Sequence, residues 1–401
     1  MTSLSATSSA EIPRRSIVLL ATAAFASAAT TRITDSVLPQ IADEFDVSIA
    51  AVAIVASVYT FAYGSFQALF GPVGDRFGKY RIVLFICMAS VVTATACGLS
   101  GSFNGIIFAR LISGMTSAAI IPLSMAWIGD VVDYEERQPI LARFMFGQVL
   151  GVLAGQIGGG ILGEYFGWRA SFFVLAGVFA VVSLGLIYEL RTNPLAAERP
   201  TPVHTSWLKT WAATARLVLI PRVRFVLVVV ALEGFAVFGA FTYVGLHLRN
   251  RFGFDFGTVG LYLAVFAAGA TAYVLFSRQF LNLLGQGKMS LLGTIFIGGG
   301  LIVIGFAPQA QWSLPAIALI GMGYYMIHNT LQTLATQMVP EARGAAVALF
   351  ATSFYVSQAA GVVVCGFLID RIGIPAMFTL MAALAVFVGL IMLTRIRHAS
   401  Q

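Results

Sequence analysis

Long apolar runs separated by short polar stretches make up most of the chain. About twelve segments reach the roughly 20 residues that a helix needs to cross the hydrocarbon core of a bilayer. Inside lipid every backbone amide must find an internal partner, so these segments are predicted to be α-helices. The predicted spans are 16–38, 48–70, 81–100, 105–128, 141–163, 170–189, 224–246, 257–277, 289–307, 313–336, 344–368 and 374–394.

The composition explains why lipid must be the main solvent. Charged residues make up 10% of the chain and apolar residues 59%, with a mean hydropathy of +0.89. A soluble domain has about 25% charged residues. The cysteines lie inside apolar runs without the spacing of a disulfide framework or metal site, so we interpret them as packing residues. They are Cys87, Cys97 and Cys365.

The net charge of +7 is explained by membrane topology. Most of the 24 Lys and Arg residues fall in loops on one side of the predicted spans, which places both termini in the cytoplasm. Nucleic acid is therefore not an expected partner. The first apolar run follows Arg14 and Arg15 like a signal peptide, but it continues to Pro39 and is expected to remain as a helix. We expect an integral protein of a bacterial inner membrane.

The two halves of the chain repeat each other. Residues in the first half recur at a nearly constant spacing in the second, as Gly78 with Gly285 and Gly167 with Gly373. We therefore predict an all-α polytopic membrane protein with two six-helix bundles related by a pseudo-two-fold axis. The bundles are 1–190 and 224–401. The linker 191–223 contains "SWLKTWAATARLVL", which suits either a short helix on the membrane surface or a solvated segment.

Three stretches carry a family resemblance. "GPVGDRFGKYR" resembles the loop signature of the major facilitator superfamily, and "ARLISGMTSAA" resembles its fourth-span signature. "GVLAGQIGGG" is similar to the fifth-span signature of the drug:proton antiporter branch, with Gln156 in place of its proline. The resemblance implies the major facilitator fold and a role for Arg110 in proton coupling. The loop residues that match are Gly71, Asp75, Arg76, Gly78 and Lys79.

The charged loop has two interpretations. Asp75 can accept hydrogen bonds from a helix N-terminus of the other bundle and pair with a nearby arginine, which would make the loop a latch that opens and closes one side. Alternatively, its cations only hold the orientation in the membrane.

Glycines recur every fourth residue along the fifth span and form a smooth strip on one helix face. Such a strip allows close helix–helix approach, so we predict a packing role. The residues are Gly147, Gly151, Gly155, Gly159 and Gly163.

Ionisable residues inside spans are costly in lipid and are therefore candidate functional groups. Glu233 lies well inside the seventh span, has no Lys or Arg within a helical turn, and is a candidate proton carrier. Asp35 lies three residues after Arg32 on one helix face, and with Pro39 it resembles first-span sequences of drug antiporters. For Arg32 and Asp35 the alternative is a simple ion pair at the end of the helix. For Arg110 the alternative is a structural arginine at the membrane interface.

A polar and aromatic stripe marks the tenth span in "GYYMIHNTLQT". Four of its residues share one helix face and are predicted to bind substrate, although helix–helix hydrogen bonding explains the pattern as well. They are Tyr325, His328, Asn329 and Gln332. Weaker candidates are Gln148, Gln156 and Gln358.

These patterns predict a secondary active transporter that works by alternating access. We expect proton-coupled efflux of small amphipathic organic compounds, or else carriage of a defined metabolite such as a sugar or organic anion, with Arg32 and Arg110 as anion ligands. The chain contains no H-E-x-x-H, G-x-S-x-G or Walker motif, which argues against an enzyme or an ATP-driven pump. We expect no cofactor beyond the coupling proton, and partners limited to the bilayer and a small-molecule substrate. A monomer is expected.

Overall fold

The computed structural model describes residues 13–67, 69–197 and 207–399, and in these residues all regular structure is helical. The first half of the chain forms α1 (Arg14–Arg32), α2 (Leu38–Phe45), α3 (Ile49–Gln67), α4 (Phe70–Phe77), α5 (Lys79–Gly98), α6 (Phe103–Ser117), α7 (Ile120–Val131), α8 (Tyr134–Phe166), α9 (Trp168–Thr192) and α10 (Pro194–Ala197).

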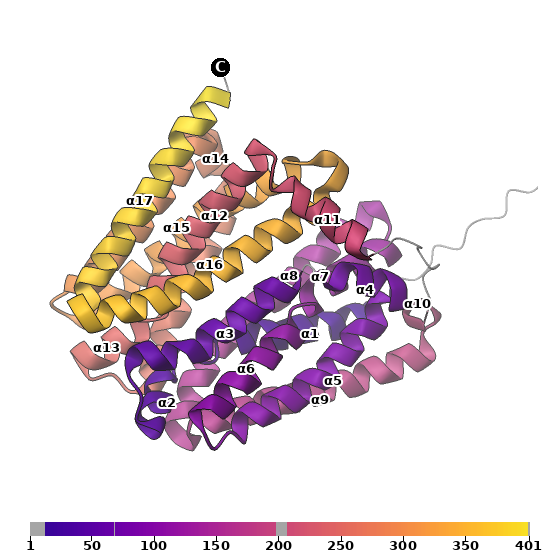
Figure 1. The fold of residues 1–401 in the computed structure, drawn as a ribbon, viewed down its shortest axis with the longest axis horizontal. Coiled ribbons are helices and arrows are strands. Elements are labelled where there is room, and N and C mark those ends of the chain that lie inside the picture. Colours follow the sequence, from indigo (N-terminus) through magenta and orange to yellow (C-terminus); the bar gives the residue numbers. More distant parts are fainter. Residues whose placement is uncertain (1–12, 68, 198–206, 400–401) are drawn as a thin grey trace, which may run out of the picture.

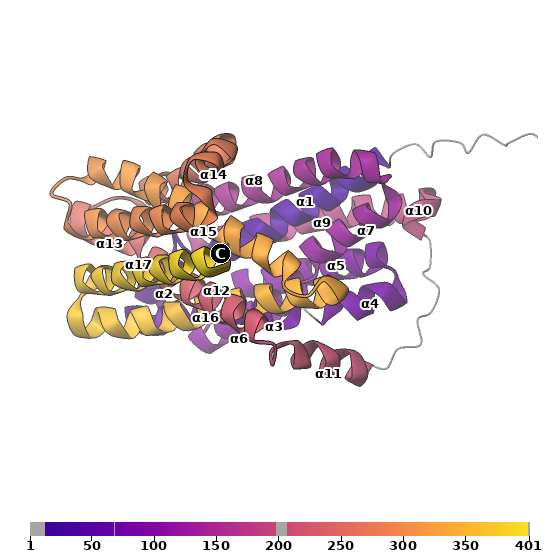
Figure 2. The same ribbon diagram turned by 90° about the horizontal axis from the view of Figure 1, so that it is seen from above.

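The second half lies beside the first (Figure 1), and the long helices of both halves run in broadly the same direction (Figure 2). Its elements are α11 (Trp207–Leu217), α12 (Pro221–Phe241), α13 (Val244–Phe252), α14 (Phe256–Phe306), η1 (Ala310–Trp312), α15 (Ser313–Gln337), η2 (Pro340–Ala342), α16 (Arg343–Ile372) and α17 (Ile374–Ala399).

The helices account for the predicted spans. Nine helical stretches of the described residues are long and apolar enough to cross a membrane. One of them, α14, is 51 residues long and contains Gly285 in a non-helical conformation, so it comprises two spans. With this division, and with the apolar helices α1 and α15, every predicted segment corresponds to a helix. The fold class predicted from the sequence is confirmed.

Three predicted spans are broken, which the sequence analysis did not foresee. In the first, α1 ends at Arg32, a turn follows, and α2 begins again with Pro39 in its first turn, where the missing amide hydrogen costs nothing. In the fourth, α6 ends at Ser117 and α7 begins at Ile120. In the seventh, α12 ends at Phe241 and α13 begins at Val244. The first of these breaks lies beside the buried side chains of Arg32 and Asp35.

The internal repeat is visible in the backbone. Gly78 and Gly285 both have positive φ, 95° and 68°, and Gly167 and Gly373 both have φ of 78°. Glycine adopts this left-handed region without the steric cost of a Cβ atom. Equivalent turns of the two halves therefore use glycine at equivalent sequence positions.

The glycine strip of α8 packs directly on α1. A Cβ atom at Gly151, Gly155 or Gly159 would overlap the main-chain carbonyl of Phe25, Ala29 or Ile33, respectively. The contacts advance by four residues on both helices, so the two backbones stay in register over about two turns. This close approach requires residues without side chains.

The two halves meet along two helix pairs. Between α3 and α16, the Thr352 hydroxyl donates to the Gly64 carbonyl at 2.9 Å. Between α8 and α14, Gly160 and Gly260 leave no room for a Cβ against the opposing backbone. Each half also has its own apolar core, so the halves are separate packing units joined by these narrow seams.

The linker contains the helix α11, which is one of the two predicted alternatives. Residues 198–206 and the side chains of Trp207 and Trp211 lie outside the described part of the structure, so the predicted contact with a membrane surface stays a prediction. The three cysteines are buried and unbonded to one another, in agreement with a packing role.

Candidate functional site

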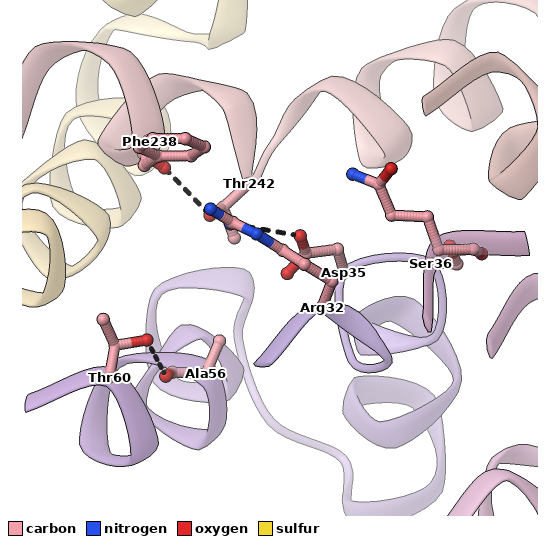
Figure 3. A network of polar contacts seen from close by, with 8 residues as sticks. Arg32, Asp35, Ser36, Ala56, Thr60, Phe238 and Thr242 are labelled. Carbon is pink, nitrogen blue, oxygen red and sulfur yellow. Dashed lines mark hydrogen bonds and ion pairs between the residues drawn. The ribbon is translucent and has the colours of Figure 1, made fainter. Parts of the chain in front are cut away.

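Arg32 joins the two halves at the break after α1. Its Nη1 lies 3.5 Å from Oδ2 of Asp35, and its guanidinium carbon lies 4.2 Å from the ring centroid of Phe238 on α12 (Figure 3). Both charged side chains are buried. The ion pair belongs to the first half and the aromatic ring to the second, so relative motion of the halves must change this cation–π contact.

Glu233 has a partner on another helix. Its Oε2 lies 2.9 Å from Nδ1 of His328, which α15 contributes. Sequence analysis found no cation within a helical turn of Glu233 and gave it no partner, which is wrong; the partner lies 95 residues away along the chain, beyond the reach of local spacing. The other carboxylate oxygen, Oε1, is buried and has no hydrogen-bond partner among the described residues. This atom is an open acceptor for a proton or a substrate group.

Aromatic rings enclose the Glu233–His328 pair. The His328 ring stacks on Tyr324 at 4.8 Å and lies at the same distance from Phe354. Tyr324 in turn lies 4.9 Å from Phe238, the ring that carries Arg32. The two candidate groups predicted separately from the sequence, the first-span ion pair and the tenth-span stripe, are thus connected through the rings of Phe238 and Tyr324.

The aromatic row continues into the first half. Tyr355 on α16 meets Tyr63 on α3 edge-to-face at 4.9 Å, and Tyr63 stacks with Tyr59 at 6.0 Å. The guanidinium of Arg110 lies 4.0 Å above the Tyr59 ring. Sequence analysis did not select Phe238, Phe354 or Tyr355, because aromatic residues are frequent throughout the chain and their spacing does not show which helices face each other.

Arg110 is fully buried on α6. Its Nε donates to the carbonyl of Val55 at 3.2 Å and its Nη1 to that of Thr30 at 3.1 Å, while Nη2 has no hydrogen-bond partner in the described residues. Asp35 is close enough to act on it electrostatically. The arginine ties α6 to α1 and α3, and its role in proton coupling stays a prediction.

The amide candidates divide into two groups. Gln156 and Gln358 are buried, and with Gln148 they have side-chain oxygens without a hydrogen-bond partner in the described residues. Asn329 and Gln332 are exposed, and Asn329 donates to the hydroxyl of Tyr273 at 3.4 Å. The structure therefore brings His328 of the tenth-span stripe into the site, with Tyr325 5.1 Å from Tyr324, and leaves the stripe's last two residues outside.

Residues 20–362 match the family model of the Major Facilitator Superfamily. The chain belongs to this superfamily. Among its relatives, an uncharacterized MFS-type transporter of Bacillus subtilis, YtbD, is 23% identical over 89% of each chain. The efflux pump radE of Floropilus chiversii is 26% identical over 73% of this chain and 62% of its own length.

Solved structures support the same fold. The nucleoside transporter NupG superposes with a TM-score of 0.74 at 13% identity, covering 94% of this chain and 98% of its own. A bacterial homologue of the human lysosomal transporter Spinster, in an inward-facing and unoccupied conformation, gives 0.72 at 16% identity and 95% coverage of both chains. The family model and the relatives together make the protein a membrane transporter of the Major Facilitator Superfamily and not an enzyme.

In this Major Facilitator transporter the charged loop is paired within its own half. Lys79 lies 3.3 Å from Asp75 and 2.5 Å from Asp130, which lies in the last turn of α7. Gly71 and Arg76 lie in α4, and Arg76 is exposed. Sequence analysis missed Asp130, since 51 residues separate it from Lys79. A bond from Asp75 to the other bundle, as a latch requires, stays a prediction for another conformation.

A second ion pair lies at the end of the first half opposite to the charged loop. It predicts that the stability of the fold depends on pH. Arg169 donates to Glu44 at 2.6 Å and lowers the pKa of that carboxyl below its ordinary 4.5, and Trp168 donates to the same oxygen. A depressed pKa stabilises the fold above pH 4.5, and this contribution disappears as the pH falls through the lowered value.

We therefore expect Glu44→Gln to lower the melting temperature at neutral pH. Solvent screens this half-exposed pair, so its loss should cost about 1 kcal/mol or less. Thermal unfolding of wild type and variant across pH checks this. The two melting curves should converge well below pH 4.5, and a difference that persists there would show that the pair's charge is not responsible.

Proposed function

We propose that this transporter exports small amphipathic organic compounds in exchange for protons. The observation that supports it most is the buried Glu233–His328 pair with its unpartnered carboxylate oxygen. A carboxyl group within a bundle is costly and is retained where it serves transport. Next to an imidazole it can receive a proton from one side of the membrane and release it to the other as the halves move.

The residues around the Glu233–His328 pair suit an apolar or amphipathic substrate. Rings of Phe238, Tyr324 and Phe354 surround His328 and Arg32, and such walls favour planar or branched apolar bodies over heavily hydroxylated ones. The few polar groups orient the substrate without demanding one particular shape. The likeness to the efflux pump radE supports the same direction of transport.

Coupling follows from competition for the open acceptor. When Glu233 is ionised, its free oxygen can accept a hydrogen bond from the substrate or attract a cationic one. When it is protonated, that attraction is lost and the substrate leaves. The proton and the substrate therefore cannot bind to this carboxyl at the same time. This mutual exclusion is the condition for exchange. In this proposal the termini lie in the cytoplasm and one chain forms one pathway.

We expect several unrelated amphipaths to drive proton movement. In inverted vesicles with an acid interior and a pH-sensitive dye, added lipophilic cations and neutral amphipaths should enter and release protons, whereas sugars and organic acids should not. A response to a single metabolite would instead favour a dedicated carrier with Arg32 as anion ligand. No response to any compound, from protein shown to be inserted, would contradict proton exchange.

A further inference from the structure

A groove of about 820 Å³ runs between α1 and α8 at the end of the bundle where α1 begins. It is separate from the aromatic site, which starts at the other end of α1. Its lining is mostly apolar and includes Val18, Phe25 and Leu150, with Thr22 on the wall. Val18 is 62% exposed and Leu150 40%, so the groove opens on the surface of the first half.

The groove exists because the glycine strip loosens at this end. A Cβ at Gly151 or Gly159 would overlap the α1 backbone, but one at Gly147 would lie 3.1 Å from the Ala21 carbonyl oxygen. The helices are thus in tight contact over their later turns and separate before Gly147. The opening is built by backbone packing and does not depend on the position of a mobile side chain.

Two arginines are the charged residues of the lining. Arg14 begins α1 and Arg143 lies on α8, and neither has an ion-pair partner among the described residues. The register of the glycine contacts places Arg143 level with Ile17, three residues beyond Arg14. At 1.5 Å per residue, the two cations stand about 4.5 Å apart along the helix axis.

Charge at one end and an apolar trough beyond it match a phospholipid. From Arg14 to Phe25 the wall of the groove extends about 16 Å, which is enough for much of an acyl chain. Basic pockets between membrane helices bind lipid headgroups. We propose that the groove binds one anionic phospholipid of the adjacent leaflet, with its phosphate between Arg14 and Arg143 and one acyl chain along α1.

A bound lipid would act on the transport machinery without touching the substrate. It would hold α1 and α8 apart at one end, while the same two helices carry Arg32 and Gln156 at the other. Anionic lipid is therefore expected to change the transport rate. This inference rests on the groove alone and does not depend on protons or on the class of substrate.

The test is lipid retention measured by native mass spectrometry. Purified full-length transporter is mixed with phosphatidylglycerol or with zwitterionic phosphatidylethanolamine. We expect wild type to retain one phosphatidylglycerol in preference, and Arg14→Gln/Arg143→Gln to bind it roughly tenfold or more weakly. The matched control Arg222→Gln/Arg224→Gln removes two exposed cations from the start of α12, outside the groove, and should bind like wild type.

A second variant tests the trough itself. Thr22→Phe fills the groove and keeps both arginines, so it should also lose the retained lipid while remaining monodisperse. Equal retention by wild type and both groove variants would overturn the proposal, as would equal retention of the two lipids. Dimers that disappear in the groove variants would overturn it too, because the occupant would then be a second copy.

Discussion

Replacing Glu233 with glutamine is expected to reduce substrate-driven proton release to the level of vesicles without the transporter. Glutamine keeps the size of the side chain and can still hydrogen-bond to His328, but it cannot take up or release a proton. Because the neutral amide resembles the protonated carboxyl, substrate binding, measured by quenching of intrinsic fluorescence, should weaken as well. The melting temperature should stay close to that of wild type, which distinguishes this result from a general loss of folding.

Glu189→Gln is the matched control. Glu189 is also a buried carboxyl on a long helix, but it accepts hydrogen bonds from Ser16 and Asn193 and lies away from the aromatic site. Proton release by this variant should match wild type. If Glu233→Gln still moves protons, Glu233 is not the carrier, and Asp35 becomes the next residue to replace. If it loses proton release but keeps full substrate affinity, proton and substrate do not compete for this carboxyl, and the proposed coupling is wrong.

Gly151→Leu is expected to be the most destabilising single substitution in the glycine strip. Its side chain would collide with the main-chain carbonyl of Phe25, which cannot move without shifting α1. Overpacking of this kind costs about 1–3 kcal/mol or more, so we expect roughly 3 kcal/mol and a clearly lower melting temperature in detergent.

Gly158→Leu provides the comparison on the same helix. Nothing lies within 4 Å of a Cβ atom at Gly158, so this change adds the same side chain to α8 without a collision. It should melt close to wild type. Equal destabilisation by the two substitutions would mean that leucine is harmful anywhere on α8, and that contact with α1 is not the reason for the glycines.

The local rules of the sequence were sufficient for the scaffold. Apolar length predicted the helices, and the repeated positions of Gly78 with Gly285 and Gly167 with Gly373 predicted two equivalent halves, because a left-handed turn selects glycine wherever it occurs. The four-residue glycine period also predicted a smooth helix face. These properties depend only on residues close together in the sequence, so the periodicity of the sequence is sufficient to predict them.

The breaks within the helices were harder to predict from the sequence. The first, fourth and seventh predicted spans each contain an interruption that a window of apolar residues does not register; the breaks follow Arg32, Ser117 and Phe241. Their position matters for the site, since the turn after Arg32 directs Asp35 back toward the guanidinium. Pro39 was a signal for the first break, and Pro122 lies just after the break in the fourth span, but no proline marks the break after Phe241.

The sequence by itself determined a twelve-span membrane protein with a repeated architecture. It selected Arg32, Asp35 and Glu233 as ionisable residues too costly to bury without a purpose, and His328 as part of a polar stripe. Only the tertiary structure decided their partners. Glu233 meets His328, and Arg32 rests on Phe238 from the other half, because periodicity shows which face of a helix is polar but not which helix it will face. That choice is made by the packing of glycine strips and apolar cores across the whole chain.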